Sequence, residues 1–386
     1  MRILHCCLAA FYIDNYSYQE NILPRIHSEL GYEVQIVAST ETYITKTKIG
    51  YVEPSSYISS DGIKISRLGY NKLLPHFIMK KLRIYVGLSK ILDEFKPDII
   101  FLHDVQFIDV SKIIKYAKKN PKVKIFADCH TDFINSARNW FSKNILHGII
   151  YKHCANLIEP YTKKFFGVLP ARMDFLKEMY KLPDKKIELL VMGADDSKIN
   201  FDNKKEIRNN IREKLNISNN DFLMVTGGKI DKRKNIHLLL KAVSELNKKD
   251  IKLILFGLPD EDMKIEIDKY SNNKTIRNIG WIESNKVYDF FLASDLAIFP
   301  GTHSVLWEQA VGTGLPCVFR KWKGFEHVDI GGNCKFIYND NVEEIKDVIM
   351  EIYNNKEIYN NMKNKSFTRG REFFSYIDIA KRAIGL

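Results

Sequence analysis

The sequence predicts an α/β protein built from two doubly wound domains. Strand-like runs alternate with helix-like runs from end to end, which is the pattern of parallel sheets with crossover helices. A chain of 386 residues is too long for one compact core, because single cores stop growing beyond roughly 250 residues. Hydrophobic residues at 45% and charged residues at 27% are typical of a globular protein and exclude a disordered or fibrous one.

The first half contains the strand-like runs of the expected first domain, residues 1–200. They read RILHCCLA, EVQIVAS, IKISRLG, PDIIFLH, VKIFADCH, ANLIEP and KIELLVMGA, with amphipathic stretches at residues 18–30 and 108–119 between them. His5 interrupts the first apolar run and Arg2 is its sole basic residue, so we interpret it as a buried strand rather than a secretory signal.

The composition changes near residue 200, where NFDNKKEIRNNIREKLNISNND is typical of a linker followed by a surface helix. The strand pattern then restarts with FLMVTGGK, IKLILFG, TIRNIGWI, LAIFP and PCVFRKW. We expect a second domain over residues 201–368, with ligands in a cleft at the carboxyl ends of strands. Residues 369–386 fit a helix that crosses back to the first domain, and equally an ordinary terminal helix.

A formal net charge of +12 indicates a surface that attracts nucleic acid, acidic lipid or a phosphorylated substrate. The six cysteines form no CxxC pair, which favours a reducing, cytosolic setting. Because no apolar run approaches the roughly 18 residues of a spanning helix, membrane contact is expected to be peripheral. The stretch YNKLLPHFIMKKLRIYVGLSKILDEFK fits either a lipid-facing surface or a core-facing helix, and its basic residues are Lys72, Lys80, Lys81 and Arg83.

Two common nucleotide-binding motifs are missing. Residues 8–20, LAAFYIDNYSYQE, contain no glycine where GxGxxG would follow the first strand, and the chain has no Walker loop. These absences argue against a dehydrogenase and a P-loop NTPase. Gly312 and Gly314 stand at the end of an expected helix, where glycine commonly serves as a cap.

A strand end suited to phosphate is present in VTGGKIDKRKNIHLLLKA. Gly227 and Gly228 allow a ligand to approach the backbone closely, and a helix begins near Asn235. The alternative is a charged surface turn. The basic residues before the helix are Lys229, Lys232, Arg233 and Lys234.

A second anion site is expected in LAIFPGTHSVLWEQAVGTGLPCVF, residues 296–319. Residues 304–307 are expected to form the first turn of a helix, whose unpaired N–H groups and positive dipole end would bind an anion. Two helix starts with lysines suit a diphosphate. Glu308 has the chemistry to bind a vicinal diol such as that of ribose; the alternative is a surface group that complements the helix dipole.

Taken together, these segments resemble the donor half of a known family. GGKIDKRKNIHLLLKA, LILFG and IGWIESNKVYDFFLASDLAIFPGTHSVLWEQAVGTGLPCV follow one another as in the retaining GT-B glycosyltransferases of the large bacterial group 1 family, which build capsule, lipopolysaccharide and glycolipid sugars. The resemblance covers roughly residues 220–320 and is weaker over nearly the whole chain, where YQENILPRIHSELGYEVQIVAS and FADCHTD carry it.

The resemblance implies a GT-B fold of two Rossmann-like domains facing a cleft. It implies transfer of a sugar, with retention, from a nucleoside diphosphate sugar to a hydroxyl of a glycan or lipid-linked acceptor in bacterial surface polysaccharide biosynthesis. It further implies a cytoplasmic protein, with contact to the inner face of the membrane, and no nucleic-acid partner. No cofactor or metal is expected, and the triplet Asp260, Glu261 and Asp262 is interpreted as a solvated helix start.

Roles carry over to residues that match the family's motifs. Lys229 and Lys234 fall on its phosphate contacts, Glu308 on its ribose-binding glutamate, and His130 on the histidine that approaches the transferred sugar. The alternative for His130 is a satisfied histidine beside Asp128 and Asp132. The expected catalytic residues are therefore His130, Lys229 and Lys234; the expected donor-binding residues are Gly228, Lys229, Lys234, His303, Ser304, Val305 and Glu308; and the expected acceptor-side residues are Asp14, Asn15, Tyr18 and Gln19.

The sequence also departs from the family pattern. The family's first glutamate, eight positions before the second, is replaced here by Pro300, so His303 or Ser304 is the candidate to stand near the sugar hydroxyls. The first loop has Ala9 and Ala10 in place of glycine. Two other classes stay open: a nucleotide-sugar epimerase of the same fold, and a non-catalytic binder of nucleic acid or other anions, which the charge alone suggests.

Overall fold

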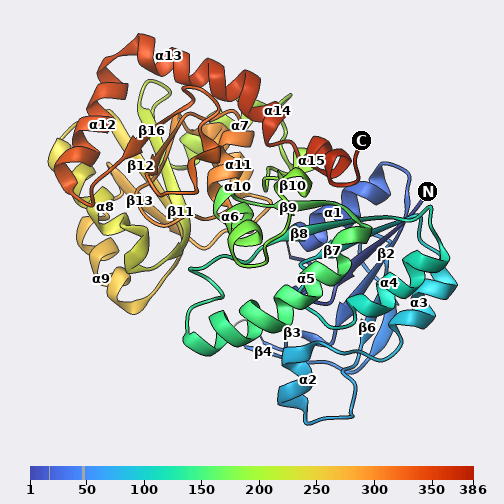
Figure 1. The fold of residues 1–386 in the computed structure, drawn as a ribbon. Coiled ribbons are helices and arrows are strands. Elements are labelled where there is room, and N and C mark those ends of the chain that lie inside the picture. The colour runs from blue at the N-terminus through green and yellow to red at the C-terminus, as the bar shows by residue number, and fades with distance from the viewer. Residues whose placement is uncertain (17, 46–47) are drawn as a thin grey trace. The chain divides into compact units, whose positions relative to one another are not determined.

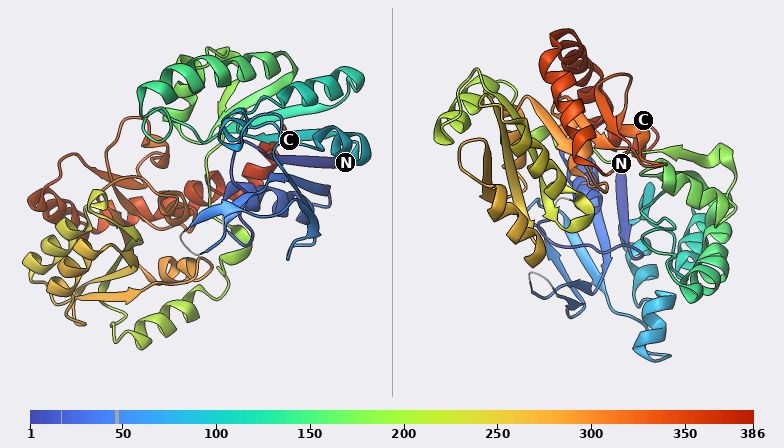
Figure 2. Two further views of the ribbon diagram at one scale, coloured as in Figure 1. Left: turned by 90° about the horizontal axis from the view of Figure 1, so that it is seen from below. Right: turned by 90° about the vertical axis from the view of Figure 1, so that its left-hand side faces the viewer.

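The structure is a computed structural model that describes residues 1–16, 18–45 and 48–386. The chain forms two compact units, each with its own sheet (Figure 1). The first unit comprises Met1–Val191 and Ile379–Leu386, and the second comprises Met192–Asp378. The predicted α/β class with two doubly wound domains is confirmed by these two sheets and the helices packed against them (Figure 2).

The sheet of the first unit has eight strands in the order β10-β9-β8-β7-β1-β2-β6-β5. All neighbouring pairs are parallel except the edge pair β5 and β6. The central strands are buried on both faces, which is why they read as continuous apolar runs. The strands are β1 (Arg2–Cys7), β2 (Glu33–Ser39), β5 (Ser55–Ile58), β6 (Lys64–Leu68), β7 (Ile99–His103), β8 (Lys124–Cys129), β9 (Thr162–Gly167) and β10 (Ile187–Leu189), with a separate hairpin of β3 (Glu41–Tyr43) and β4 (Ile49–Tyr51).

The helices of the first unit follow the predicted crossover pattern. The stretch 18–30 forms α1 (Gln19–Glu29), and 108–119 forms α4 (Val110–Lys119) with its apolar face buried. The others are α2 (His76–Leu82), α3 (Leu88–Phe95), a π-helix (Ser142–Tyr151), α5 (Lys152–Ile158) and α6 (Pro170–Glu178).

One strand prediction in this half is wrong. The run ANLIEP is the end of α5 and a 3-10 turn, Glu159–Tyr161, and the strand is the following segment TKKFFG of β9. Cys154, Ala155 and Ile158 are buried at helical spacing, so a short apolar run continued a helix rather than starting a strand.

The second unit has six parallel strands in the order β13-β12-β11-β14-β15-β16. All five predicted runs form strands, and the sequence analysis missed the edge strand β16. The strands are β11 (Phe222–Ile230), β12 (Ile251–Pro259), β13 (Ile276–Gly280), β14 (Leu296–Phe299), β15 (Cys317–Arg320) and β16 (Cys334–Ile337); the helices are α7 (Lys204–Lys214), α8 (Ile236–Leu246), α9 (Glu261–Tyr270), α10 (Val287–Ala293), α11 (Leu306–Gly312), α12 (Val342–Asn354) and α13 (Lys356–Lys365).

The C-terminal helix expected over residues 369–386 is broken in two. α14 (Arg371–Phe373) and α15 (Tyr376–Ala383) flank a break at which Ala194 donates its N–H to the carbonyl of Phe374, 2.8 Å away, and accepts the N–H of Tyr376 at 3.2 Å. These two backbone hydrogen bonds replace hydrogen bonds that a continuous helix would form. From Ile379 onward the chain is part of the first unit.

Local features agree with two smaller interpretations. Asp260 caps α9 by accepting the N–H of Met263 at 2.9 Å, so the acidic triplet begins a helix. Gly314 has φ +75° and donates its N–H to the carbonyl of Val311, which ends α11.

All six cysteines are free and buried. Among the described residues, no helix has both the length and the apolar character needed to cross a membrane.

Gly257 is the position at which a side chain fits least. Its φ is +129°, and a Cβ there would lie 1.8 Å from the carbonyl oxygen of Gly228 on the neighbouring strand β11. Gly280 also has a positive φ, +72°, but a Cβ there would meet nothing within 4 Å. We expect Gly257→Ala to destabilise the protein by about 3 kcal/mol or more, and Gly280→Ala by about 1 kcal/mol. Thermal unfolding of both variants measures the difference, and equal losses would contradict the steric explanation.

Candidate active site

Two loops of the second unit meet at the carboxyl ends of the adjacent strands β11 and β14. The first contains a short 3-10 helix, Lys232–Lys234, and the second is the turn at residues 300–305. Thr302 donates its N–H to the carbonyl of Arg233 at 3.0 Å. Lys234 Nζ donates to the carbonyls of Thr302 and His303, both at 2.8 Å. Residues some 70 positions apart in the sequence are therefore fixed against each other.

Gly301 makes this close approach possible. A Cβ at this position would lie 2.3 Å from the carbonyl carbon of Lys234 and 2.4 Å from the carbonyl oxygen of Arg233. The neighbouring Pro300 carbonyl also accepts a hydrogen bond from the Asn235 side chain at 3.2 Å. Glycine at residue 301 is therefore required for this packing.

A pocket opens between these loops and the end of β11. Its floor includes Thr226, whose Oγ1 is buried and has no hydrogen-bond partner. Its wall includes Lys234 and the backbone of Gly227, two of the features that the sequence singled out. An unpartnered buried hydroxyl beside a lysine favours a polar ligand in this pocket. The remaining lining residues are Ile236, Phe299, Pro300, Gly301, Thr302 and Ser304.

The two predicted phosphate-binding lysines differ in their surroundings. Lys229 is exposed at the end of β11. Lys234 is partly buried, and this burial lowers the pKa of its ammonium to about 8; the charges of Arg233 and Lys229 lower the pKa further, whereas Asp231 opposes them. Its two backbone carbonyl partners accept two of its three N–H groups without neutralising its charge.

The helix after the second loop starts later than predicted. Residues 304–307 were expected to be its first turn, but α11 begins at Leu306 with Val305 in the capping position. Ser304 Oγ accepts the N–H of Leu306 at 3.3 Å, and the Ser304 carbonyl accepts the N–H of Trp307 at 3.0 Å. Ser304 therefore lines the pocket just ahead of the helix, within reach of its first N–H groups.

Glu308 is fully buried, so the surface alternative for this residue is wrong. Its Oε1 faces Nε2 of His303 and Nε2 of His327, each at 2.7 Å, and its Oε2 is buried with no partner. Burial favours the neutral carboxyl, but the two histidines outweigh it and hold the pKa of Glu308 well below its usual range. The sequence analysis missed His327, which lies in a 3-10 turn (Glu326–Val328) after β15.

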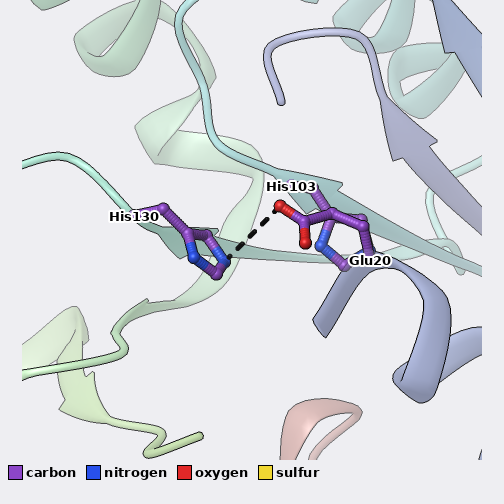
Figure 3. Close-up of side chains that lie close together, drawn as sticks. All are labelled: Glu20, His103 and His130. Atoms are coloured by element: carbon purple, nitrogen blue, oxygen red, sulfur yellow. Dashed lines mark ion pairs between the residues drawn. The ribbon is translucent and has the colours of Figure 1, made fainter. Parts of the chain in front are cut away.

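A second cluster lies in the first unit, around His130 at the end of β8 (Figure 3). His130 Nε2 is 3.3 Å from Asp128 Oδ2 and 4.0 Å from Glu20 Oε1. Burial alone would lower the pKa of His130, but Asp128 and Glu20 raise it to about 9, so the imidazole is protonated at neutral pH. His130 keeps 22% of its side chain exposed, enough for contact with a ligand.

Of the expected acceptor-side residues, only Gln19 joins this cluster, donating from Nε2 to Asp128 Oδ2 at 3.3 Å. Asp14 pairs with Arg67 at 2.8 Å and accepts the hydroxyl of Tyr57. Asn15 has φ +62° in the same loop, and Tyr18 exposes 46% of its surface. Asp132, named as a neighbour of His130, instead accepts the N–H groups of Ile134 and Asn135.

Within the part of the chain that the structure describes, two groups of side chains have the spacing to hold a metal ion: Glu20 with His103 and His130, and His303 with Glu308 and His327. In the second group the ligand atoms are 2.7 Å apart, which is a hydrogen-bond distance. Two ligands on one tetrahedral zinc ion are roughly 3.3 Å apart, given metal bonds of about 2.0 Å. The present arrangement therefore shares protons rather than a cation.

Comparison with known proteins finds solved structures of similar architecture. HepE from Anabaena, solved in complex with UDP, shares 13% identity and superimposes with a TM-score of 0.70, covering 99% of this chain and 98% of that one. WaaG, a glycosyltransferase of lipopolysaccharide biosynthesis, shares 14% identity with a TM-score of 0.62 over 100% of both chains. A putative UDP-N-acetylglucosamine 2-epimerase from Listeria monocytogenes shares 11% identity with a TM-score of 0.62, over 99% of this chain and 94% of that one. These likenesses establish the GT-B fold.

A family model matches part of the sequence of the second unit. Residues 207–369 match the family model described as glycosyl transferases group 1, and no curated protein matches the chain. Over these residues the second unit is therefore similar to the glycosyl transferases group 1.

Proposed function

We propose that the protein transfers a sugar from a nucleoside diphosphate sugar to a hydroxyl of a glycan or lipid-linked acceptor, with retention of the anomeric configuration. The observation that carries the proposal is the pocket of the second unit, where Lys234, the Gly227 backbone and the turn at residues 300–305 converge. HepE, which has the same fold, binds UDP. We place the diphosphate of the donor against the two loops that line this pocket.

The chemistry follows from where charge develops. As the bond from the anomeric carbon to the diphosphate breaks, negative charge builds on the leaving oxygen, and Lys234, Lys229 and the N–H groups after Ser304 stabilise it. The leaving phosphate takes the proton of the attacking hydroxyl. His130, a cation at neutral pH, donates a hydrogen bond to a hydroxyl of the transferred sugar. No metal takes part in this scheme, because the lysines supply the positive charge.

Glu308 has one oxygen committed and one free for the donor. Its Oε1 is held by His303 and His327, whereas Oε2 has no partner. We assign Oε2 to the ribose hydroxyls, which requires a small opening at this buried position. His303 then serves to hold Glu308 ionised, a different task from contacting the transferred sugar.

Removal of either lysine tests donor binding. UDP, GDP or ADP at 100 times its dissociation constant stabilises a protein by roughly 2.7 kcal/mol, which thermal unfolding detects. We expect Lys229→Ala and Lys234→Ala to lose most of that stabilisation, and Lys229→Ala to raise the barrier to transfer by about 3 kcal/mol. Lys346→Ala is the matched control, because Lys346 pairs with Glu343 and Glu245 on α12 and α8, away from the pocket loops.

EDTA should leave binding and turnover unchanged, and abolition by EDTA would contradict the metal-free scheme.

The pKa of Lys234 gives the site a pH dependence. Because burial lowers this pKa to about 8, the free protein loses the charge as pH rises through 8. Binding of a diphosphate requires the ammonium, so affinity should fall about tenfold for each pH unit above 8 and be constant below it. Lys234→Arg keeps its charge at these pH values and should abolish this decline. Titration calorimetry with the nucleotide between pH 6.5 and 9.5 measures both proteins, and a decline retained in the arginine variant would contradict the assignment.

We further propose a role in bacterial surface polysaccharide biosynthesis, with contact to the inner face of the cytoplasmic membrane. The supporting observation is an apolar patch at α2, where Leu73 is 83% and Phe77 71% exposed, beside exposed Lys72 and Lys81. Two of the four basic residues of this stretch do not contribute free positive charge to this patch. Lys80 pairs with Glu41 at 2.9 Å, and Arg83 donates to the carbonyl of Gln106 at 3.0 Å.

Flotation with vesicles of anionic lipid tests this contact. Wild type should float at low salt and less at high salt, because screening weakens the attraction between lysines and lipid. Leu73→Ser with Phe77→Ser should float several-fold less, whereas Ile265→Ser, equally exposed at 70% on α9, should behave as wild type. Absence of wild-type binding at either salt concentration would remove the membrane proposal and leave sugar transfer untouched.

The epimerase alternative makes a separate prediction about products. An epimerase acts on the donor alone, so incubation without acceptor would yield an epimerised sugar nucleotide. The proposed transferase yields glycosylated acceptor and free nucleoside diphosphate.

A further inference from the structure

Three histidines form a buried row in the first unit, and none of them entered the sequence-based site. His27, on α1, is joined through Nδ1 to Nε2 of His5, on β1, at 2.9 Å. His5 Nδ1 is joined in turn to Nε2 of His103, at the end of β7, at 3.0 Å. All three are fully buried, and neighbouring rings are stacked, with centroids 5.1 Å and 5.3 Å apart.

Each end of the row faces a hydrogen-bond acceptor. His103 Nδ1 is 3.0 Å from Asp128 Oδ2, and His27 Nε2 is 2.8 Å from the carbonyl oxygen of Ala380. Ala380 lies in the last turn of α15, and the N–H of Ile384 bonds to Lys381 instead, at 3.2 Å. The carbonyl that His27 meets is therefore one of the unpaired carbonyls at a helix C-terminus, which favour a positive partner.

Counting protons fixes the charge of the row. It contains four hydrogen-bonded gaps, namely Ala380 to His27, His27 to His5, His5 to His103, and His103 to Asp128. Each gap requires one proton. Three neutral imidazoles carry one proton each, and neither an amide carbonyl nor a carboxylate supplies any. The fourth proton must come either from one imidazolium in the row or from a protonated Asp128.

The surroundings of Asp128 decide between these two. Its oxygens also accept from the N–H of Asp104 at 3.2 Å and from Gln19 at 3.3 Å, and they face protonated His130 at 3.3 Å. Burial opposes the carboxylate, but His130 and His103 hold the pKa of Asp128 well below its usual range. Of the three rings only His103 contacts the carboxylate, with Nδ1 3.0 Å from Asp128 Oδ2, so we assign the excess proton to His103. Burial lowers the pKa of His5 and of His27, which agrees with neutral rings at these two positions.

We propose that His27, His5 and His103 hold one excess proton as an imidazolium at His103, and that this charge makes His103 a positioning residue for His130. Asp128 then lies between two cations, His103 and His130, and contacts both. His103 fixes the orientation and charge of the carboxylate that His130 faces, while His5 and His27 fix the tautomer of His103 from behind. The relevance of this row to sugar transfer rests on the proposed function. The charge of the row does not depend on that function.

The charged groups around the row are few and are consistent with one excess proton. Glu20 reaches His130 from α1, and Arg172 on α6 lowers the pKa of His130 through its charge. Burial raises the pKa of the neighbouring thiols Cys6 and Cys7, which are therefore neutral. Asp104, in the loop after β7, is bound by Thr131 and Gln106.

Nitrogen-15 NMR of the histidine rings in the intact, ligand-free protein tests the row directly. At pH 7 we expect imidazolium signals for His103 as well as His130, and a single tautomer protonated at Nε2 for His27, with the signals assigned by His103→Gln, His130→Gln and His27→Gln. Three neutral rings at pH 7 would overturn the proposal.

His103→Gln supplies a second measurement that a purely structural role would not move. Removing a like charge from the far side of Asp128 should raise the NMR titration midpoint of His130 above its value of about 9, by on the order of one pH unit. His147→Gln is the control, because His147 is buried in the same unit against the hydroxyl of Tyr180 at 3.0 Å and lies outside the row. An unchanged His130 midpoint in His103→Gln would show that His103 is neutral. Both measurements are made without donor, so failure of the row and failure of donor binding are told apart.

Discussion

The pocket of the second unit depends on the close contact between the turn at Gly301 and the 3-10 helix before α8. Backbone approaches backbone there, with Thr302 bonded to Arg233 and Lys234 bonded to two carbonyls of the turn. Because strands β11 and β14 are adjacent and parallel, their loops leave the sheet at the same edge, and glycine at residue 301 omits a Cβ that would clash with the backbone of Arg233 and Lys234. The position of Lys234, and so the charge of the pocket, follows from that contact.

A second constraint is the free-energy cost of burying a charged carboxylate. Both units offset this cost in the same way. Glu308 in the second unit and Asp128 in the first are fully buried, and each is held by two histidines. A buried carboxylate without such partners would be neutral, because transfer of the charge out of water costs far more than protonation. The histidines therefore keep the buried carboxylates of Glu308 and Asp128 ionised.

The sequence predicted what depends on local pattern and missed what depends on distant pairs. Strand ends rich in glycine and lysine predicted the pocket at Lys234, because parallel strands bring such ends to one edge. His327 could not be paired with Glu308 in advance, since 19 residues and a strand separate them. His5, His27 and His103 lie on three separate elements, and each alone is indistinguishable from an ordinary core histidine. The helix start at Leu306 was misplaced because Ser304 bonds its own turn instead of starting the helix.

The two clusters differ in how their cations are neutralised, and this difference assigns them different ligands. The partners of Lys234 are carbonyls, which accept two of its N–H groups but leave its full positive charge for an anion. His130, by contrast, faces the carboxylates of Asp128 and Glu20. A phosphate at His130 would meet these two carboxylates at close range and be repelled. Under the proposed function, neutral hydroxyls suit the cluster of the first unit, whereas a diphosphate suits the lysine pocket of the second unit.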